Sequence, residues 1–230
     1  MEANPAVDDY VSRKRWLLWG FDWAARRIRH VGLRRYGAET SDAIAGEARA
    51  EYEALIPQLP YIGGGRNPHT RLIIAAAMFL ALYKALKRRG RPVEEIGELV
   101  HETVQAFFDT LPRFLLRLYG RLNFTRRALR GAHRGALESQ EREDPGGWVY
   151  AVVEGDGAAF DWGIDQLECG ICKLFAAHDA GEFVPYMCDL DFIASDYFGW
   201  GLARTTTLAE GGERCDFRFK RERGVSRIIP

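Results

Sequence analysis

Hydrophobic residues in the first 140 positions recur every three to four residues, which is the spacing of one face of an α-helix. Glycine and proline interrupt this pattern and set the expected ends of each helix. The N-cap of the second helix is expected among Thr40, Ser41 and Asp42. Predicted helices cover residues 13–36, about 42–56, 67–89 and 92–110, followed by an arginine-rich helical stretch after Pro112.

In that arginine-rich stretch, arginine recurs every four residues. A four-residue spacing places side chains on one helix face, and we interpret this face as solvated. The arginines of the two runs are Arg113, Arg117 and Arg121, and then Arg126, Arg130 and Arg134.

The pattern changes after residues 138–147, a polar stretch that ends in Asp-Pro-Gly-Gly. This turn predicts a boundary between a helical region, residues 1–145, and an α+β region, residues 146–230. Predicted elements in the second region are strands at 148–154 and around 160–164, helices at 168–178 and 185–198, and strands at 200–208 and 214–220. We therefore expect an α+β fold. Its helical N-terminal part would pack against a C-terminal antiparallel sheet of β-β-α-α-β-β order, with helices on one face.

Composition is that of an ordinary globular protein, with 47% hydrophobic and 28% charged residues. The longest apolar run, Leu72–Tyr83, has 12 residues, whereas a membrane-spanning helix needs about 20. The N-terminus is acidic and has no apolar segment typical of a signal peptide. We expect a cytoplasmic protein with free thiols and no membrane partner.

The net charge of zero conceals two regions of opposite charge. Residues 1–140 hold 23 Lys and Arg against 15 Asp and Glu, whereas residues 141–230 hold 9 against 17. The two regions could attract each other within one chain or in a homo-oligomer, or the basic region could bind nucleic acid or anionic lipid. Because no nucleic-acid recognition motif is present, we expect no nucleic-acid partner.

All four cysteines lie within about fifty residues of the second region, close to several aspartates. Thiols are strong nucleophiles near neutral pH and also ligands for soft metals. Cys169 and Cys172 form a CxxC pair, which is typical of a redox pair or of half a zinc site. Together with Cys188 and Cys215 they could form an all-cysteine zinc site, although the second CxxC of a zinc ribbon is missing.

The last predicted strand places Cys215 and Phe217 on one face by alternation. If Leu208 pairs with Glu213, Arg204 lies opposite Phe217 and Thr206 opposite Cys215, whereas a slip of one residue brings in Thr205 and Thr207 instead. An arginine on a buried face needs an anionic partner. The candidates are a substrate carboxylate, Asp191 and Glu182.

On the helix that begins at Pro185, Cys188, Asp191 and Ser195 share one face. A carboxyl group one turn from a thiol can exchange a proton with it. Cys188 is expected in the first turn, where the helix dipole lowers a thiol pKa, whereas the carboxylates of Asp189 and Asp191 oppose that shift. A cysteine on a helix is also commonly a small core residue.

Several motifs in combination resemble the L-2-amino-thiazoline-4-carboxylic acid hydrolase family over roughly residues 60–220. Asn67-Pro68 and the following Ala/Leu-rich helix resemble its helical part. The remaining motifs are Glu168-Cys169, Pro185-x-x-Cys188-x-x-Asp191, Arg204-Thr205-x-Thr207-Leu208-Ala209 and Gly211-Gly212-x-x-Cys215-Asp216-Phe217. Cys172 is not part of this pattern.

The resemblance implies a hydrolase that opens a cyclic C=N bond of a small carboxylate substrate without a cofactor, as in opening an amino-thiazoline ring toward a carbamoyl-cysteine. Cys188 would attack the amidine-like carbon, and Asp191 would carry protons. Cys169 and Cys215 would line the site, and either is an alternative nucleophile. The expected substrate-binding residues are Arg204, which would hold the carboxylate, and Thr207 and Asp216. The alternatives are a non-catalytic module that binds a small ligand or zinc through the same cysteines, and an accessory protein that has lost catalysis.

Overall fold

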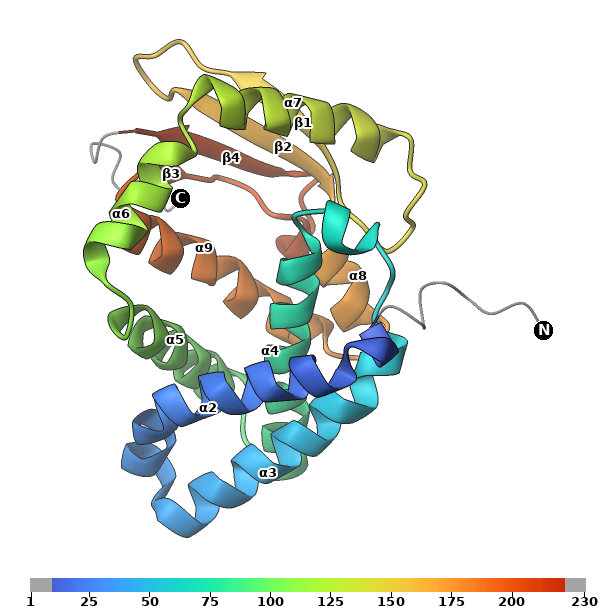
Figure 1. Ribbon diagram of the computed structural model, residues 1–230, viewed down its shortest axis with the longest axis vertical. Coiled ribbons are helices and arrows are strands. Elements are labelled where there is room, and N and C mark those ends of the chain that lie inside the picture. Colours follow the sequence, from blue (N-terminus) through green and yellow to red (C-terminus); the bar gives the residue numbers. More distant parts are fainter. Residues whose placement is uncertain (1–9, 222–230) are drawn as a thin grey trace, which may run out of the picture. The chain divides into compact units, whose positions relative to one another are not determined.

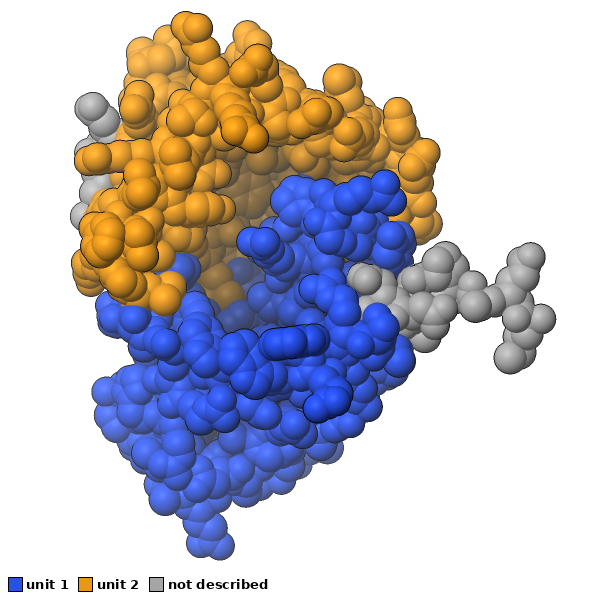
Figure 2. All heavy atoms as spheres, in the orientation of Figure 1, with its two compact units in different colours: residues 1–110, 173–187 blue, residues 111–172, 188–230 orange. Residues whose placement is uncertain are grey.

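The computed structural model describes residues 10–221 and divides them into two compact units (Figure 2). Within this range, unit 1 contains residues 10–110 and 173–187, and unit 2 contains residues 111–172 and 188–221. The division predicted at residue 145 falls inside unit 2, so the compact units follow a different boundary. The chain passes between the units at three places because residues 173–187 return to unit 1.

Unit 1 is built from helices at the predicted positions (Figure 1). They are α2 (Lys14–Tyr36), α3 (Ala38–Leu55), α4 (Thr70–Arg88) and α5 (Val93–Asp109), with short 3-10 turns η1 (Ile56–Gln58), η2 (Gly64–Arg66) and η3 (Gly181–Phe183). The fully buried side chains of its core include Tyr52, Ile73, Leu80, Leu86 and Ile96. Burial of such apolar surface is the main force that holds the helices together.

The predicted cap of α3 is wrong. The helix begins at Ala38, and no side chain caps it. Gly37 turns the chain directly from α2 into α3 with a φ of 75°, a conformation that glycine adopts without steric cost. The polar residues at 40–42 therefore lie inside the helix instead of ahead of it.

Unit 2 contains α6 (Arg113–Leu122) and α7 (Arg126–Gln140) (Figure 1). They divide the arginine-rich stretch at Thr125, whose hydroxyl oxygen accepts the N–H of Ala128 and caps α7. Two further helices, α8 (Gly170–Ala176) and α9 (Val184–Phe198), each have residues in both units. No helix within residues 10–221 is long and apolar enough to span a membrane.

The sheet of unit 2 has four antiparallel strands in the order β1-β2-β4-β3. Along the chain, β1, β2, α8, α9, β3 and β4 follow one another, with 3-10 turns before α9 and after β3. The α+β class is confirmed. The strands are β1 (Val149–Glu154), β2 (Trp162–Glu168), β3 (Gly201–Ala203) and β4 (Cys215–Lys220).

Strand β3 is shorter than the predicted strand over residues 200–208. The chain leaves the sheet after Ala203 and forms a loop and the 3-10 turn η4 (Leu208–Glu210). Its register, with Leu202 opposite Phe219 and Ala203 opposite Arg218, is the one obtained by pairing Leu208 with Glu213. The alternative register, shifted by one residue, does not occur.

The two faces of the sheet differ in chemistry. On one face Ile164 lies opposite Phe217 and Gln166 opposite Cys215. The other face carries Asp165, whose carboxylate forms ion pairs at 3.3 and 2.8 Å with Arg214 and Arg218, respectively. One face is therefore suited to the core and the other to solvent.

Helix α7 packs against the edge strand β1 and protects the free edge of the sheet. Tyr150 lies opposite Gln166 on the apolar face, and its hydroxyl closely approaches Gly135 of α7. The hydroxyl of Ser139 accepts the N–H of Tyr150, and the side-chain amide of Gln140 donates to the carbonyl of Tyr150. These bonds satisfy main-chain groups of the edge strand β1, which would otherwise be open to pairing with another strand.

Candidate functional site

Thiols and charged groups from three parts of unit 2 lie close together beside the apolar face of the sheet. Cys169 and Cys172 come from the junction of β2 and α8, Cys188 and Asp191 from α9, and Cys215 from β4. These residues and Arg204 lie close enough to influence one another electrostatically. The fold thus brings together residues that are far apart in the sequence. The most distant of the four cysteines, Cys169 and Cys215, are separated by 46 positions.

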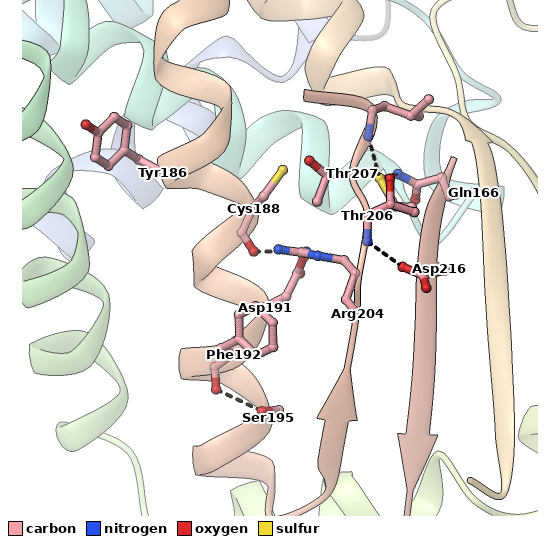
Figure 3. Close-up of polar contacts among 12 residues, drawn as sticks. Gln166, Tyr186, Cys188, Asp191, Phe192, Ser195, Arg204, Thr206, Thr207 and Asp216 are labelled. Atoms are coloured by element: carbon pink, nitrogen blue, oxygen red, sulfur yellow. Dashed lines mark hydrogen bonds and ion pairs between the residues drawn. The ribbon is translucent and has the colours of Figure 1, made fainter. Parts of the chain in front are cut away.

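Arg204 is the first residue after β3, and its side chain reaches across to α9 (Figure 3). Only 5% of this side chain is exposed. Its guanidinium carbon lies 5.0 Å from the ring centre of Phe192 and 5.3 Å from that of Phe217. Aromatic faces stabilise a cation that has lost water. Phe217 is the residue that the predicted register placed opposite Arg204.

The anion that satisfies Arg204 in this structure is Asp191. The Nη1 atom of Arg204 donates to Asp191 Oδ2 at 2.8 Å and to the main-chain carbonyl of Cys188 at 3.2 Å. The other protein candidate, Glu182, instead accepts from the hydroxyl of Tyr83 at 2.7 Å and pairs with Lys87. Arg204 therefore links the carboxylate of Asp191 to the main-chain carbonyl of Cys188, which lies one turn earlier in α9.

Asp191 is half-buried, with 46% of its side chain exposed. Loss of water around the carboxyl group raises its pKa to about 6, against the opposing influence of Arg204. A carboxyl group with this pKa can both donate and accept a proton near neutral pH. Its exposure leaves it open to a small molecule.

Asp216 holds the loop that carries Arg204. Its carboxylate accepts hydrogen bonds from the N–H of Thr205 at 2.8 Å, the hydroxyl of Thr205 at 2.6 Å and the N–H of Thr206 at 2.9 Å. By alternation along β4, Asp216 lies on the face opposite to Cys215. Its contacts shape the loop from outside the thiol cluster, and its predicted role in binding substrate stays a prediction.

Thr207 caps the 3-10 turn η4. Its hydroxyl donates to Glu210 Oε2 at 2.6 Å and accepts the N–H of Glu210 at 3.2 Å. The residue is buried, with 4% of its surface exposed. These contacts account for Thr207 structurally, and its predicted role at the substrate is not tested by them.

Cys215 is buried against the turn that follows the Arg204 loop. Its sulfur accepts the N–H of Leu208 at 3.3 Å and lies 3.9 Å from the side-chain nitrogen of Gln166. Burial raises the pKa of the thiol. Gln166 was not predicted as a site residue, although its alternation with Ile164 and Trp162 on β2 would have placed it on this face.

Cys188 has a raised thiol pKa, mainly because of burial and further because of the nearby Asp191 carboxylate. The sequence predicted a helix dipole opposed by nearby aspartates, and the resulting shift of the Cys188 pKa is upward. Helix α9 begins at Val184, so Cys188 lies just past the first turn. The dipole acts most strongly within that turn and weakens beyond it. Desolvation then outweighs the influence of Arg204.

Cys169 has the opposite tendency. It lies between Glu168, the last residue of β2, and Gly170, the first of α8. Hydrogen bonds from the Cys172 thiol and from the N–H groups of Cys172 and Ile171 lower its pKa from 9.0 to about 7, despite burial. The same interaction raises the pKa of Cys172, because Cys172 is the donor.

Glycine at position 170 allows α8 to start where it does. A Cβ atom there would lie 2.8 Å from the ring of Trp148 and 2.9 Å from the carbonyl oxygen of Gly146. Trp148 is itself buried at the start of β1. The close packing of these residues fixes the position of the CxxC segment beside the sheet.

A metal site does not emerge from this cluster. Within residues 10–221, which include all four cysteines, no three His, Cys, Asp or Glu side chains are grouped in a way that could hold a metal ion. The zinc alternative stays a prediction.

A family model described as L-2-amino-thiazoline-4-carboxylic acid hydrolase matches residues 71–219. The match covers more than half of the chain and includes the CxxC segment, α9 and the Arg204 loop. The chain therefore belongs to this family, as its motifs predicted. The comparisons with curated proteins and with solved structures found no match.

Proposed function

We propose that this member of the L-2-amino-thiazoline-4-carboxylic acid hydrolase family opens a cyclic C=N bond of a small carboxylate substrate, with Cys169 as the nucleophile. The observation that carries the proposal is that the Cys172 thiol and the N–H groups of Ile171 and Cys172 donate hydrogen bonds to Cys169, which lowers its pKa to about 7, with the Asp191 carboxylate within electrostatic range. A thiolate is the reactive form of cysteine, and a pKa near 7 makes it abundant at neutral pH.

Cys169 meets this requirement better than Cys188, the first choice from the sequence. Burial and the Asp191 carboxylate favour the neutral thiol of Cys188. Three hydrogen-bond donors favour the thiolate of Cys169. In this proposal Cys188 and Cys215 line the site as neutral thiols.

Asp191 acts as the acid and base. The Cys169 thiolate adds to the C=N carbon, and the ring nitrogen takes the proton of Asp191. The carbon–sulfur bond of the ring then breaks, so that the ring sulfur leaves as a thiolate and the carbon stays bound to Cys169 as an amidinium. Water adds to this carbon, and Asp191 accepts a proton from that water. The bond from the carbon to Cys169 then breaks, the hydroxyl proton passes to the ring-derived thiolate, and the carbamoyl product leaves with the Cys169 thiolate and the protonated Asp191 restored. The ion pair with Arg204 orients the carboxyl group for both transfers. Binding of the substrate carboxylate by Arg204 remains part of the hypothesis.

Trapping the covalent intermediate tests the proposal directly. The full chain is mixed with L-2-amino-thiazoline-4-carboxylate, quenched with acid during turnover, digested and analysed by mass spectrometry. We expect a substrate-derived adduct on the peptide containing Cys169 and its absence from Cys169→Ser. Cys188→Ser serves as the matched control and should still form the adduct. An adduct on Cys188 or Cys215, or turnover by Cys169→Ser close to that of the parent, would contradict the assignment.

A further inference from the structure

Helix α6 exposes its large hydrophobic side chains instead of burying them. Only Leu116 and Gly120 of this ten-residue helix are buried. The exposed side chains are Phe114 at 70%, Leu115 at 48%, Leu118 at 51%, Tyr119 at 53% and Leu122 at 53%. Contiguous exposed apolar surface of this kind marks an interaction site on a protein.

The same part of unit 2 is strongly cationic. Residues 110–137 contain seven arginines and no Asp or Glu. Five of these arginines are exposed and have no carboxylate within ion-pair distance in the described part of the chain: Arg121, Arg126, Arg127, Arg130 and Arg134. Arginines of unit 1, by contrast, are commonly paired, as Arg88 is with Glu51 and Arg89 with Glu47.

The exposed hydrophobic side chains and the arginines follow different stripes along α6. Phe114, Leu118 and Leu122 are four residues apart and form one exposed stripe, and Arg117 and Arg121 follow a neighbouring stripe. The connection to α7 is short (Figure 1), so Arg126 and Arg127 extend the cationic side. An apolar stripe bordered by arginines is the arrangement of a helix that lies in the plane of a membrane surface.

We propose that α6 and the first turn of α7 form a docking surface for an anionic phospholipid membrane. The apolar stripe enters the boundary between headgroups and acyl chains, and the arginines bind the lipid phosphates. This contact needs no spanning helix. It departs from the expectation of no membrane partner, which rested on the lack of a spanning segment, and takes up the alternative that the basic region binds anionic lipid.

Two other occupants fit the surface less well. A second copy of the chain, docked through the same surface, would bring the arginines of both copies together at the cost of like-charge repulsion. A nucleic acid would satisfy the arginines but leave Leu118 and Leu122 without an apolar partner. An anionic bilayer satisfies both groups at once.

Flotation of the full chain with lipid vesicles tests the proposal. We expect binding to phosphatidylglycerol vesicles, no binding to pure phosphatidylcholine vesicles, and release by high salt. Arg126→Gln with Arg127→Gln should weaken binding about thirtyfold, from roughly fivefold for each basic residue at an anionic surface. Leu118→Ser with Leu122→Ser should weaken it at least about tenfold. Leu72→Ser, an exposed leucine of unit 1, is the control and should bind like the unmodified chain.

The changed side chains are exposed, so thermal unfolding of the variants should match that of the parent. If the leucine variant fails to fold, Phe114→Ser alone provides the same test of the apolar stripe. Equal binding to both kinds of vesicle, or binding unaffected by both double variants, would overturn the proposal. So would a dimer in sedimentation analysis that Leu118→Ser with Leu122→Ser dissociates. Tighter binding to a double-stranded oligonucleotide than to phosphatidylglycerol would also overturn it.

Discussion

Cys169 and Cys188 belong to the same cluster in unit 2, yet their surroundings act on them in opposite directions. Cys169 is the more buried of the two, and burial alone would favour its neutral form. Its hydrogen bonds from Cys172 and the main chain reverse that tendency and lower its pKa to about 7. Cys188 receives no such hydrogen bond from residues 10–221, lies near the Asp191 carboxylate and has a raised pKa.

This difference teaches that proximity to a carboxylate does not by itself activate a thiol. Asp191 can accept a proton from a thiol, but its negative charge also opposes a thiolate beside it. Donors that point at the sulfur do not have this conflict, because they stabilise the thiolate without competing for its proton. Under the proposed function, the nucleophile and the acid–base group therefore come from different parts of the fold, the junction of β2 and α8 and helix α9.

Removal of the Cys169 thiol is the change expected to have the largest effect. Cys169→Ser should lower kcat for ring opening at least about 10³-fold, because the hydroxyl of serine is not ionised near neutral pH. Steady-state kinetics measure the loss, with circular dichroism as a check on folding. Activity close to that of the parent would remove the distinction between the two thiols.

Asp191→Asn is expected to have the next largest effect. The amide cannot donate or accept the proton, so kcat should fall about 10²-fold. Asp189→Asn, a neighbouring carboxylate that α9 carries one residue after Cys188, is the matched control and should retain most activity. If the two variants behave alike, Asp191 is not the acid–base group.

Cys172→Ala tests the donor directly through the pH dependence of the rate. In the parent, the thiolate of Cys169 is lost below pH 7 and the proton of Asp191 is lost above pH 6, so the rate should peak between about 6 and 7. Without the Cys172 donor, the pKa of Cys169 rises. The maximum should then move to higher pH and fall by about tenfold for each unit of that rise. A profile identical to that of the parent would show that Cys172 does not influence Cys169.

Cys188→Ala is expected to have the smallest effect. A neutral thiol that only lines the site contributes little to the reaction, so kcat should stay within about threefold of the parent. Kinetics at several pH values measure it, and the pH optimum should not move. A loss as large as that of Cys169→Ser would restore Cys188 as the nucleophile.

Much of the fold was predictable because local patterns dominate it. The helices of unit 1 follow the apolar spacing and the glycine and proline positions. The register of β3 on β4 is one of the two that the sequence left open. The errors concern ends of elements. Strand β3 stops after Ala203 because Asp216 accepts the main-chain N–H groups of Thr205 and Thr206, a tertiary contact that no local pattern announces.

The sequence predicted which residues form the candidate site but not the role of each residue. The sequence by itself determined that thiols, Asp191 and Arg204 would be available, which family the chain belongs to, and that an arginine on a buried face needs an anion. Only the tertiary structure decided that Asp191 is that anion and that Cys169 and Cys188 have opposite pKa shifts. The physical reason is that burial, ion pairing and hydrogen bonding depend on groups far apart in the chain, whose distances no sequence spacing records.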